Sequence, residues 1–209
     1  DYLPKDAKFW VTKATTNKSK LFSSSDIQSI VKKAIVDKLK GIYHINWFEE
    51  DGAQYPIRVF IFKDIVTIAL DASGTSLHKR GYRKESNSAP IRETLAAAIC
   101  SLAKLKHYHT LYDPMCGSGT LMIEGALYAH NIAPGLNRHF SAERFAVLPN
   151  NIWAEERERA RSLEKIDTDF QGFGSDIDGE TIKLAMANAA RLPIGKKLHF
   201  EKRDIRDFK

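Results

Sequence analysis

The sequence predicts an α/β protein in which a small α+β domain precedes an open sheet of parallel strands. Two runs rich in β-branched residues, 57–63 and 65–72, are separated by a single aspartate, which is typical of a β-hairpin. After residue 91, helical and strand-like periodicities alternate along the chain, as they do when helices connect parallel strands. A glycine turn at residues 113–120 joins one of these strands to a helix, which is where open α/β sheets bind ligands.

The first two elements are a strand and a helix. Residues 7–15 alternate apolar and polar side chains, which predicts a half-buried strand. Residues 24–40 place their apolar side chains on one helical face. The spacing of Ser25 and Gln28 fits a capping box, and we expect Gly41 to end the helix.

With the hairpin, which we expect to turn at Lys63 and Asp64, these elements predict that residues 1–75 form a small α+β unit with antiparallel strands. A basic linker at residues 76–90 follows, and residues 91–209 form the second domain. Its expected elements are a helix at 91–105 with Pro90 at its first position, a strand at 110–113, a helix from 119, a helix at 153–164, a strand at 171–175, a helix at 179–191 and a strand at 198–202.

Composition restricts the functional classes. The two cysteines among 209 residues are far apart, so neither a disulfide scaffold nor a zinc site is expected, and a cytoplasmic location is the default. No apolar run is long enough to span a membrane. Residues 1–85 hold 15 Lys and Arg against 10 Asp and Glu, a surplus of +5 in a chain with a net charge of +6. This basic first part indicates a polyanionic partner or an ordinary soluble surface.

The glycine turn 113–120 (DPMCGSGT) is the first candidate site. It has only two glycines, at a G-x-G spacing, so it lacks the third glycine of the dinucleotide fingerprint, and it is not a Walker A loop. Asp113 would repel a pyrophosphate and suits a ligand with a positive or neutral group, such as the amino-acid end of S-adenosylmethionine. A plain tight turn is the alternative.

Two more acids follow expected strands. Asp176 could accept hydrogen bonds from both hydroxyls of a ribose. For Asp178 we favour a cap on the helix that begins at residue 179. Asp204 could accept from an adenine amino group or could lie in a solvated loop. Acids at three successive strand ends are more specific than any one of them.

The motif around residues 113–124 (DPMCGSGTLMIE), followed by 132–138 (IAPGLNR), resembles the THUMP-domain RNA guanine-N2 methyltransferases, the bacterial large-subunit ribosomal RNA enzymes and their tRNA relatives. Residues 77–83 (LHKRGYR), 89–98 (APIRETLAAA) and 174–178 (GSDID) resemble the same family. The resemblance implies a partial, Rossmann-like class I methyltransferase domain behind a partial THUMP and ferredoxin-like domain that holds RNA, with 23S ribosomal RNA as the substrate. It gives no expectation for the oligomeric state.

The resemblance also implies site residues. S-adenosylmethionine would be held by Asp113, Cys116, Gly117, Ser118, Gly119, Thr120, Asp176, Ile177, Asp204, Ile205 and Thr94. RNA phosphates would be contacted by Lys79, Arg80, Arg83 and Lys84, for which a solvated linker is the alternative.

The family's catalytic signature, Asn-Pro-Pro followed by an aromatic residue, is not in this sequence, which has seven prolines and no Pro-Pro pair. We therefore expect a fragment without catalytic residues of its own, missing part of the THUMP domain as well. Two alternatives stay open, which are a non-catalytic RNA-binding module that keeps the cofactor fold and a DNA adenine-N6 methyltransferase.

Overall fold

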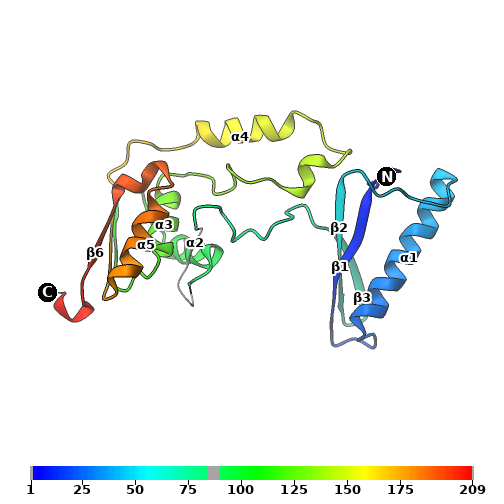
Figure 1. The fold of residues 1–209 in the computed structure, drawn as a ribbon, viewed down its shortest axis with the longest axis horizontal. Helices are drawn as coiled ribbons and strands as arrows, with labels where there is room; N and C mark the ends of the chain where they lie inside the picture. Colours follow the sequence, from blue (N-terminus) through cyan, green and yellow to red (C-terminus); the bar gives the residue numbers. More distant parts are fainter. Residues whose placement is uncertain (1, 84–89, 209) are drawn as a thin grey trace. The chain divides into compact units, whose positions relative to one another are not determined.

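The computed structural model describes residues 2–83 and 90–208, which divide into two compact units. The first unit combines Asp1–Thr75 with His139–Trp153, and the second combines Ser76–Arg138 with Ala154–Lys209. Each unit has a sheet of its own (Figure 1). Each also has its own hydrophobic core. No helix of the described residues is both long and apolar enough to cross a membrane.

The sheet of the first unit has the strand order β1-β2-β3. Its elements are β1 (Lys8–Asn17), α1 (Ser24–Tyr43), β2 (Gln54–Phe62) and β3 (Ile65–Leu70). The hairpin is confirmed, because β2 and β3 are antiparallel and the turn residues Lys63 and Asp64 adopt positive φ angles. The expectation of purely antiparallel strands is wrong, since α1 is a crossover helix that returns the chain to make β2 parallel to β1.

The ends of α1 also differ from those expected. The helix is capped by Ser23, whose hydroxyl accepts a hydrogen bond from the Asp26 N–H, and not through Ser25. It continues through Gly41, where a side chain would meet open space, and ends at His44 in the left-handed conformation. The packing of α1 on the sheet outweighs the low helix propensity of one glycine.

The segment His139–Trp153 completes the core of the first unit. The ring of Phe145 stacks on Tyr55 at a centroid distance of 4.5 Å. The Ala142 N–H donates to the Ala72 carbonyl at 3.1 Å, and Ala142 is buried. The sequence placed this segment in the second domain, because nothing in its local pattern shows which core it joins.

The second unit has the strand order β4-β5-β6, with all strands parallel, as predicted. Its main elements are α2 (Glu93–Leu102), β4 (Thr110–Asp113), α3 (Thr120–Ala129), α4 (Ile152–Ser162), β5 (Gln171–Asp176), α5 (Gly179–Ala189) and β6 (Leu198–Lys202). The first two residues of α4 belong to the first unit. Helices α3 and α5 pack against the strands (Figure 1) and bury a core that includes Met122, Ile123, Phe170, Ile182 and Leu198.

The other face of this sheet carries a ladder of rings. Tyr112, Phe173 and His199 are register partners on β4, β5 and β6. Their rings stack at centroid distances of 5.2 Å and 5.0 Å, and all three side chains are exposed. The aromatic ladder therefore marks the face opposite to the helices.

Candidate functional site

The turn after β4 is built on glycines in the left-handed region. Gly117 has φ 53° and Gly119 has φ 78°, and Gly119 is the N-cap of α3. A Cβ atom at Gly119 would lie 3.2 Å from the ring of Phe200 and 3.2 Å from the Cβ of Ala185. Glycine therefore satisfies both the backbone conformation and the close approach of α3 to its neighbours.

This turn brings the first two strand-end acids together. The Gly117 N–H donates to Asp176 Oδ2 at 3.1 Å, and the Cys116 N–H donates to the Ser175 carbonyl at 2.8 Å. Burial and the negative charge of Asp176 raise the pKa of Asp113, against the lowering effect of the Met115 N–H. Two carboxylates at one partly desolvated edge make this edge electronegative, so it suits a ligand that carries a positive charge.

Ser175, the residue before Asp176 on β5, has an unpaired hydroxyl. The Ser175 Oγ is buried and has no hydrogen-bond partner among the described residues. Asp176 shares its carboxylate between the Gly117 N–H and the Asp178 N–H, at 3.1 Å and 3.0 Å. Each carboxylate oxygen has a second lone pair, so Asp176 can still accept hydrogen bonds from a ligand.

Asp178 and Asp204 have different partners. Asp178 caps α5, as predicted, because its carboxylate accepts from the Glu180 N–H and the Thr181 hydroxyl. Asp204 caps a short 3₁₀ helix, Ile205–Asp207, and pairs with the guanidinium of Arg206, which lowers the pKa of Asp204. To accept a hydrogen bond from an adenine amino group, the carboxylate of Asp204 would have to release the guanidinium of Arg206.

Three side chains of the turn, those of Cys116, Ser118 and Thr120, are buried. Cys116 is buried, and desolvation together with Asp113 raises the pKa of its thiol to about 12. The hydroxyls of Ser118 and Thr120 are buried and lie 3.4 Å from each other. These three residues can therefore offer a ligand their backbone groups, while their side chains support the turn.

The remaining predicted contacts are exposed. Ile177 follows β5 with an exposed fraction of 62%, and Ile205 follows Asp204 with 45%. Such exposure of large apolar side chains is compatible with an aromatic ligand between them. Thr94 lies in the first turn of α2 and is exposed, and none of the described contacts joins it to the edge that carries Asp113.

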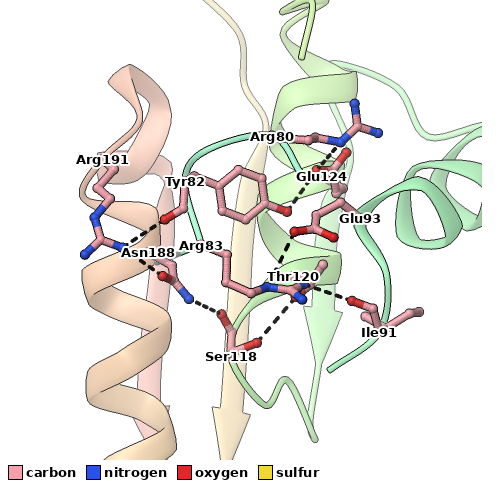
Figure 2. A network of polar contacts seen from close by, with 10 residues as sticks. All are labelled: Arg80, Tyr82, Arg83, Ile91, Glu93, Ser118, Thr120, Glu124, Asn188 and Arg191. Atoms are coloured by element: carbon pink, nitrogen blue, oxygen red, sulfur yellow. Dashed lines mark hydrogen bonds and ion pairs between the residues drawn. The ribbon is translucent and has the colours of Figure 1, made fainter. Parts of the chain in front are cut away.

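A network of buried polar side chains joins the segment before α2 to helices α2 and α3 (Figure 2). Glu124, in the middle of α3, is only 2% exposed; it accepts from the Tyr82 hydroxyl at 2.9 Å and lies 3.0 Å from Arg80 Nε. Burial raises the pKa of Glu124 to about 7, although Arg80 and Tyr82 oppose the shift. An acid in an otherwise apolar helix is the sequence signal that could have revealed this network.

Arg83 connects the segment before α2 to the first turn of α3 (Figure 2). One of its guanidinium nitrogens donates to the Thr120 hydroxyl at 2.6 Å and to the Ile91 carbonyl at 2.8 Å. Its Nε lies 3.6 Å from the buried carboxylate of Glu93. Arg83 thus holds Thr120 and the start of α2 in one arrangement.

The network corrects part of the RNA prediction. Arg80 and Arg83 were expected to contact phosphates, but their side chains are 11% and 13% exposed and are paired with Glu124 and Glu93. These two cations therefore neutralise buried carboxylates. Lys79 is exposed, and Lys84 lies outside the described residues, so phosphate contacts at these two lysines remain proposals.

Helix α5 supports the turn from its other side. Asn188 is fully buried, and its side-chain amide donates to the Ser118 carbonyl at 3.2 Å. Arg191 donates to Asn188 Oδ1 at 3.0 Å and to the Tyr82 carbonyl at 2.9 Å (Figure 2). Sequence reasoning missed this contribution, because an asparagine inside an amphipathic helix has no distinguishing pattern.

Comparisons with known proteins identify the family of each domain. Residues 80–209 match the family model of the RMKL-like methyltransferase domain, and residues 1–71 match the THUMP domain. The chain is 41% identical over 210 residues to the "Putative RNA methyltransferase YpsC" of Bacillus subtilis, covering 99% of the chain and 54% of that relative.

Two solved structures have the same fold over the whole chain. One is called "a predicted N6-adenine-specific DNA methylase from Listeria monocytogenes", with 43% identity and a TM-score of 0.93. The other is "SMU.472, a putative methyltransferase complexed with SAH", with 37% identity and a TM-score of 0.93. Each match covers 100% of this chain and 55% of the other, so the chain spans about half the length of these relatives.

Proposed function

The chain belongs to the RMKL-like methyltransferase family, and from this membership and its THUMP domain we propose that the protein is an S-adenosylmethionine-dependent RNA methyltransferase. We further propose that it methylates the exocyclic N2 of a guanine in 23S ribosomal RNA. The observation that carries the proposal is the electronegative edge formed by Asp113, Asp176 and the glycine turn between β4 and α3.

The residues at this edge fit the cofactor. S-adenosylmethionine supplies the methyl group when it is bound, and it carries a positive sulfonium and an ammonium group. Asp113 would attract the positive charge at the methionine end, and the backbone of Gly117 and Gly119 allows a close approach. Asp176 would accept from the ribose hydroxyls, and Ile177 and Ile205 would contact the adenine.

Several observations support RNA as the substrate. The THUMP match covers residues 1–71, where Lys and Arg outnumber Asp and Glu by two, and the relative from Bacillus subtilis is named as an RNA methyltransferase. A cationic surface supplies the sequence-independent part of nucleic-acid affinity. The guanine N2 position and ribosomal RNA come from the resemblance of the motifs at residues 77–138 and 174–178 alone.

DNA adenine-N6 methylation is the second candidate, since one relative carries that name. A non-catalytic RNA-binding module with a cofactor fold is the third. The complete protein, incubated with labelled S-adenosylmethionine and either ribosomal RNA or duplex DNA, separates these functions after digestion to nucleosides and mass spectrometry. N2-methylguanosine in RNA is the expected product, N6-methyladenine in DNA would replace the proposal, and RNA binding without methyl transfer would favour the third candidate.

The cofactor assignment has a test of its own. Asp176→Ala removes an acceptor of charge-assisted hydrogen bonds, so we expect S-adenosylmethionine to bind about 10- to 150-fold more weakly in isothermal titration calorimetry. Asp178→Ala is the matched control, because it removes a neighbouring aspartate that only caps α5. Equal affinities of Asp176→Ala and the unmodified protein would show that Asp176 does not hold the ribose.

A further inference from the structure

A second cavity lies in the same unit, away from the candidate cofactor edge. It has a volume of about 630 Å³ and is lined by the end of α3, by the end of α4 and by the segments that precede β4 and β5. Its lysines, Lys106 and Lys165, come before the first residues of β4 and β5. The cavity is therefore near the amino ends of the strands, whereas Asp113 and Asp176 lie at the carboxyl ends.

The charged side chains that line this cavity are mostly basic. Arg80 is paired with Glu124, and Arg159 is paired with Glu156 on its own helix. Lys106 and Lys165 are exposed and have no carboxylate partner within the part of the chain that the structure describes. Two lysine ammonium groups at one cavity are thus available to an anionic ligand.

The rest of the lining is apolar and includes one exposed ring. Leu105 and Leu127 are buried side chains of the lining, and Leu163 is 51% exposed. Tyr128 lines the cavity from α3 and is 44% exposed. A phenol ring beside aliphatic side chains provides a surface on which a planar base can stack.

We propose that this cavity binds a single-stranded segment of the RNA substrate. One base packs on Tyr128 and Leu163, and the adjoining phosphates contact Lys106 and Lys165. The volume is in the range of pockets that enclose a small molecule, so it accommodates one nucleotide. The bound nucleotide is not the methyl acceptor, because the cavity is near the opposite ends of the strands from the cofactor edge. This inference rests on the proposed action on RNA.

Charge reversal in the complete protein tests the phosphate contacts. Lys106→Glu combined with Lys165→Glu should weaken the binding of a short fluorescein-labelled single-stranded RNA by about tenfold in fluorescence anisotropy. The slope of log affinity against log salt should become shallower by about 1.4, which corresponds to two lost single-strand phosphate contacts. Lys183→Glu combined with Lys196→Glu is the matched control, because neither residue lines the cavity.

Three further measurements accompany the charge reversal, and the first of them keeps folding separate from binding. S-adenosylmethionine affinity should be the same in both lysine double variants and in the unmodified protein, which reports an intact second unit. Tyr128→Ala should weaken RNA binding and Tyr128→Phe should restore it, because phenylalanine keeps the stacking surface. In the unmodified protein, irradiated thiouridine-containing RNA should cross-link to the peptide that contains Tyr128.

The possible results separate a failure of the cavity proposal from a failure of the proposed function. An unchanged RNA affinity and salt slope in Lys106→Glu/Lys165→Glu, while the unmodified protein binds RNA, would overturn the cavity assignment and leave the proposed methyltransferase function standing. Loss of RNA affinity in these variants without methyl transfer to RNA by the unmodified protein would support the cavity and refute the proposed function. Absence of RNA binding by the unmodified protein would overturn both.

Discussion

Glu124→Gln should change how the stability of the second unit depends on pH. The carboxyl of Glu124 has its pKa raised from 4.5 to about 7 in the folded protein, because burial disfavours its charged form. Since the folded pKa lies above the unfolded value, the neutral acid stabilises the fold below about pH 4.5, and this contribution is lost as the pH rises through 7. Glutamine keeps an acceptor for Tyr82 and Arg80 but does not titrate.

The size of the pKa shift of Glu124 sets the expected change in the free energy of unfolding. A pKa difference of about 2.5, at 1.36 kcal/mol per unit, corresponds to about 3 kcal/mol between the two protonation states. Between pH 5 and pH 8, the unfolding free energy of the unmodified protein should therefore fall by about 2.5 kcal/mol relative to Glu124→Gln. The comparison cancels the other titrating groups, because both proteins share them.

Urea denaturation can follow the second unit separately. All three tryptophans, Trp10, Trp47 and Trp153, belong to the first unit, so a transition seen by circular dichroism but not by tryptophan fluorescence belongs to the second. Glu158→Gln, at an exposed position on α4, is the matched control, because it removes a carboxylate from the protein surface. If the curves of Glu124→Gln and the unmodified protein run parallel from pH 5 to pH 8, Glu124 does not titrate as argued.

Three other substitutions or treatments probe the turn. Asn188→Ala should lower the unfolding free energy by about 1–3 kcal/mol, because the buried Ser118 carbonyl loses its donor; a double-mutant cycle with Arg191→Met should show coupling between the two side chains. Gly119→Ala should cost at least about 1–2 kcal/mol from its left-handed φ alone, and a thermal midpoint equal to that of the unmodified protein would contradict the need for glycine. Cys100 and Cys116 should react with a thiol reagent at neutral pH only after denaturation, because burial raises their pKa values to about 11 and about 12; rapid labelling of the native protein would disprove this.

The elements with strong local patterns could be predicted from the sequence. Strands β4 and β6 begin and end at the predicted residues. The Lys63-Asp64 turn of the hairpin was likewise encoded locally. Helix ends were less accurate, as α1 and its true cap Ser23 show, because packing on the sheet extends a helix beyond its local signals.

The site residues at the ends of strands could be predicted from the sequence. The buried contacts of other site residues could not be predicted as well. Asp113 and Asp176 are the last residues of β4 and β5, and parallel pairing brings them to one edge. Arg80 and Arg83 appeared to be surface cations, because a basic run gives no indication that Glu124 and Glu93 lie behind it. Asp204, like Asp176, was expected to bind the cofactor because it follows a predicted strand. In the structure its carboxylate is paired with the guanidinium of Arg206, two residues further along the chain.

The contribution of His139–Trp153 to the first unit has a consequence for protein synthesis. The ribosome delivers Tyr55 about 90 residues before Phe145, the ring that stacks on it. At roughly 5–20 residues per second, the nascent first unit waits roughly 5–18 s with this part of its core uncovered. Chaperones that bind exposed apolar surface would have this interval in which to act, and a silent change of codon usage between residues 75 and 139 would lengthen or shorten it.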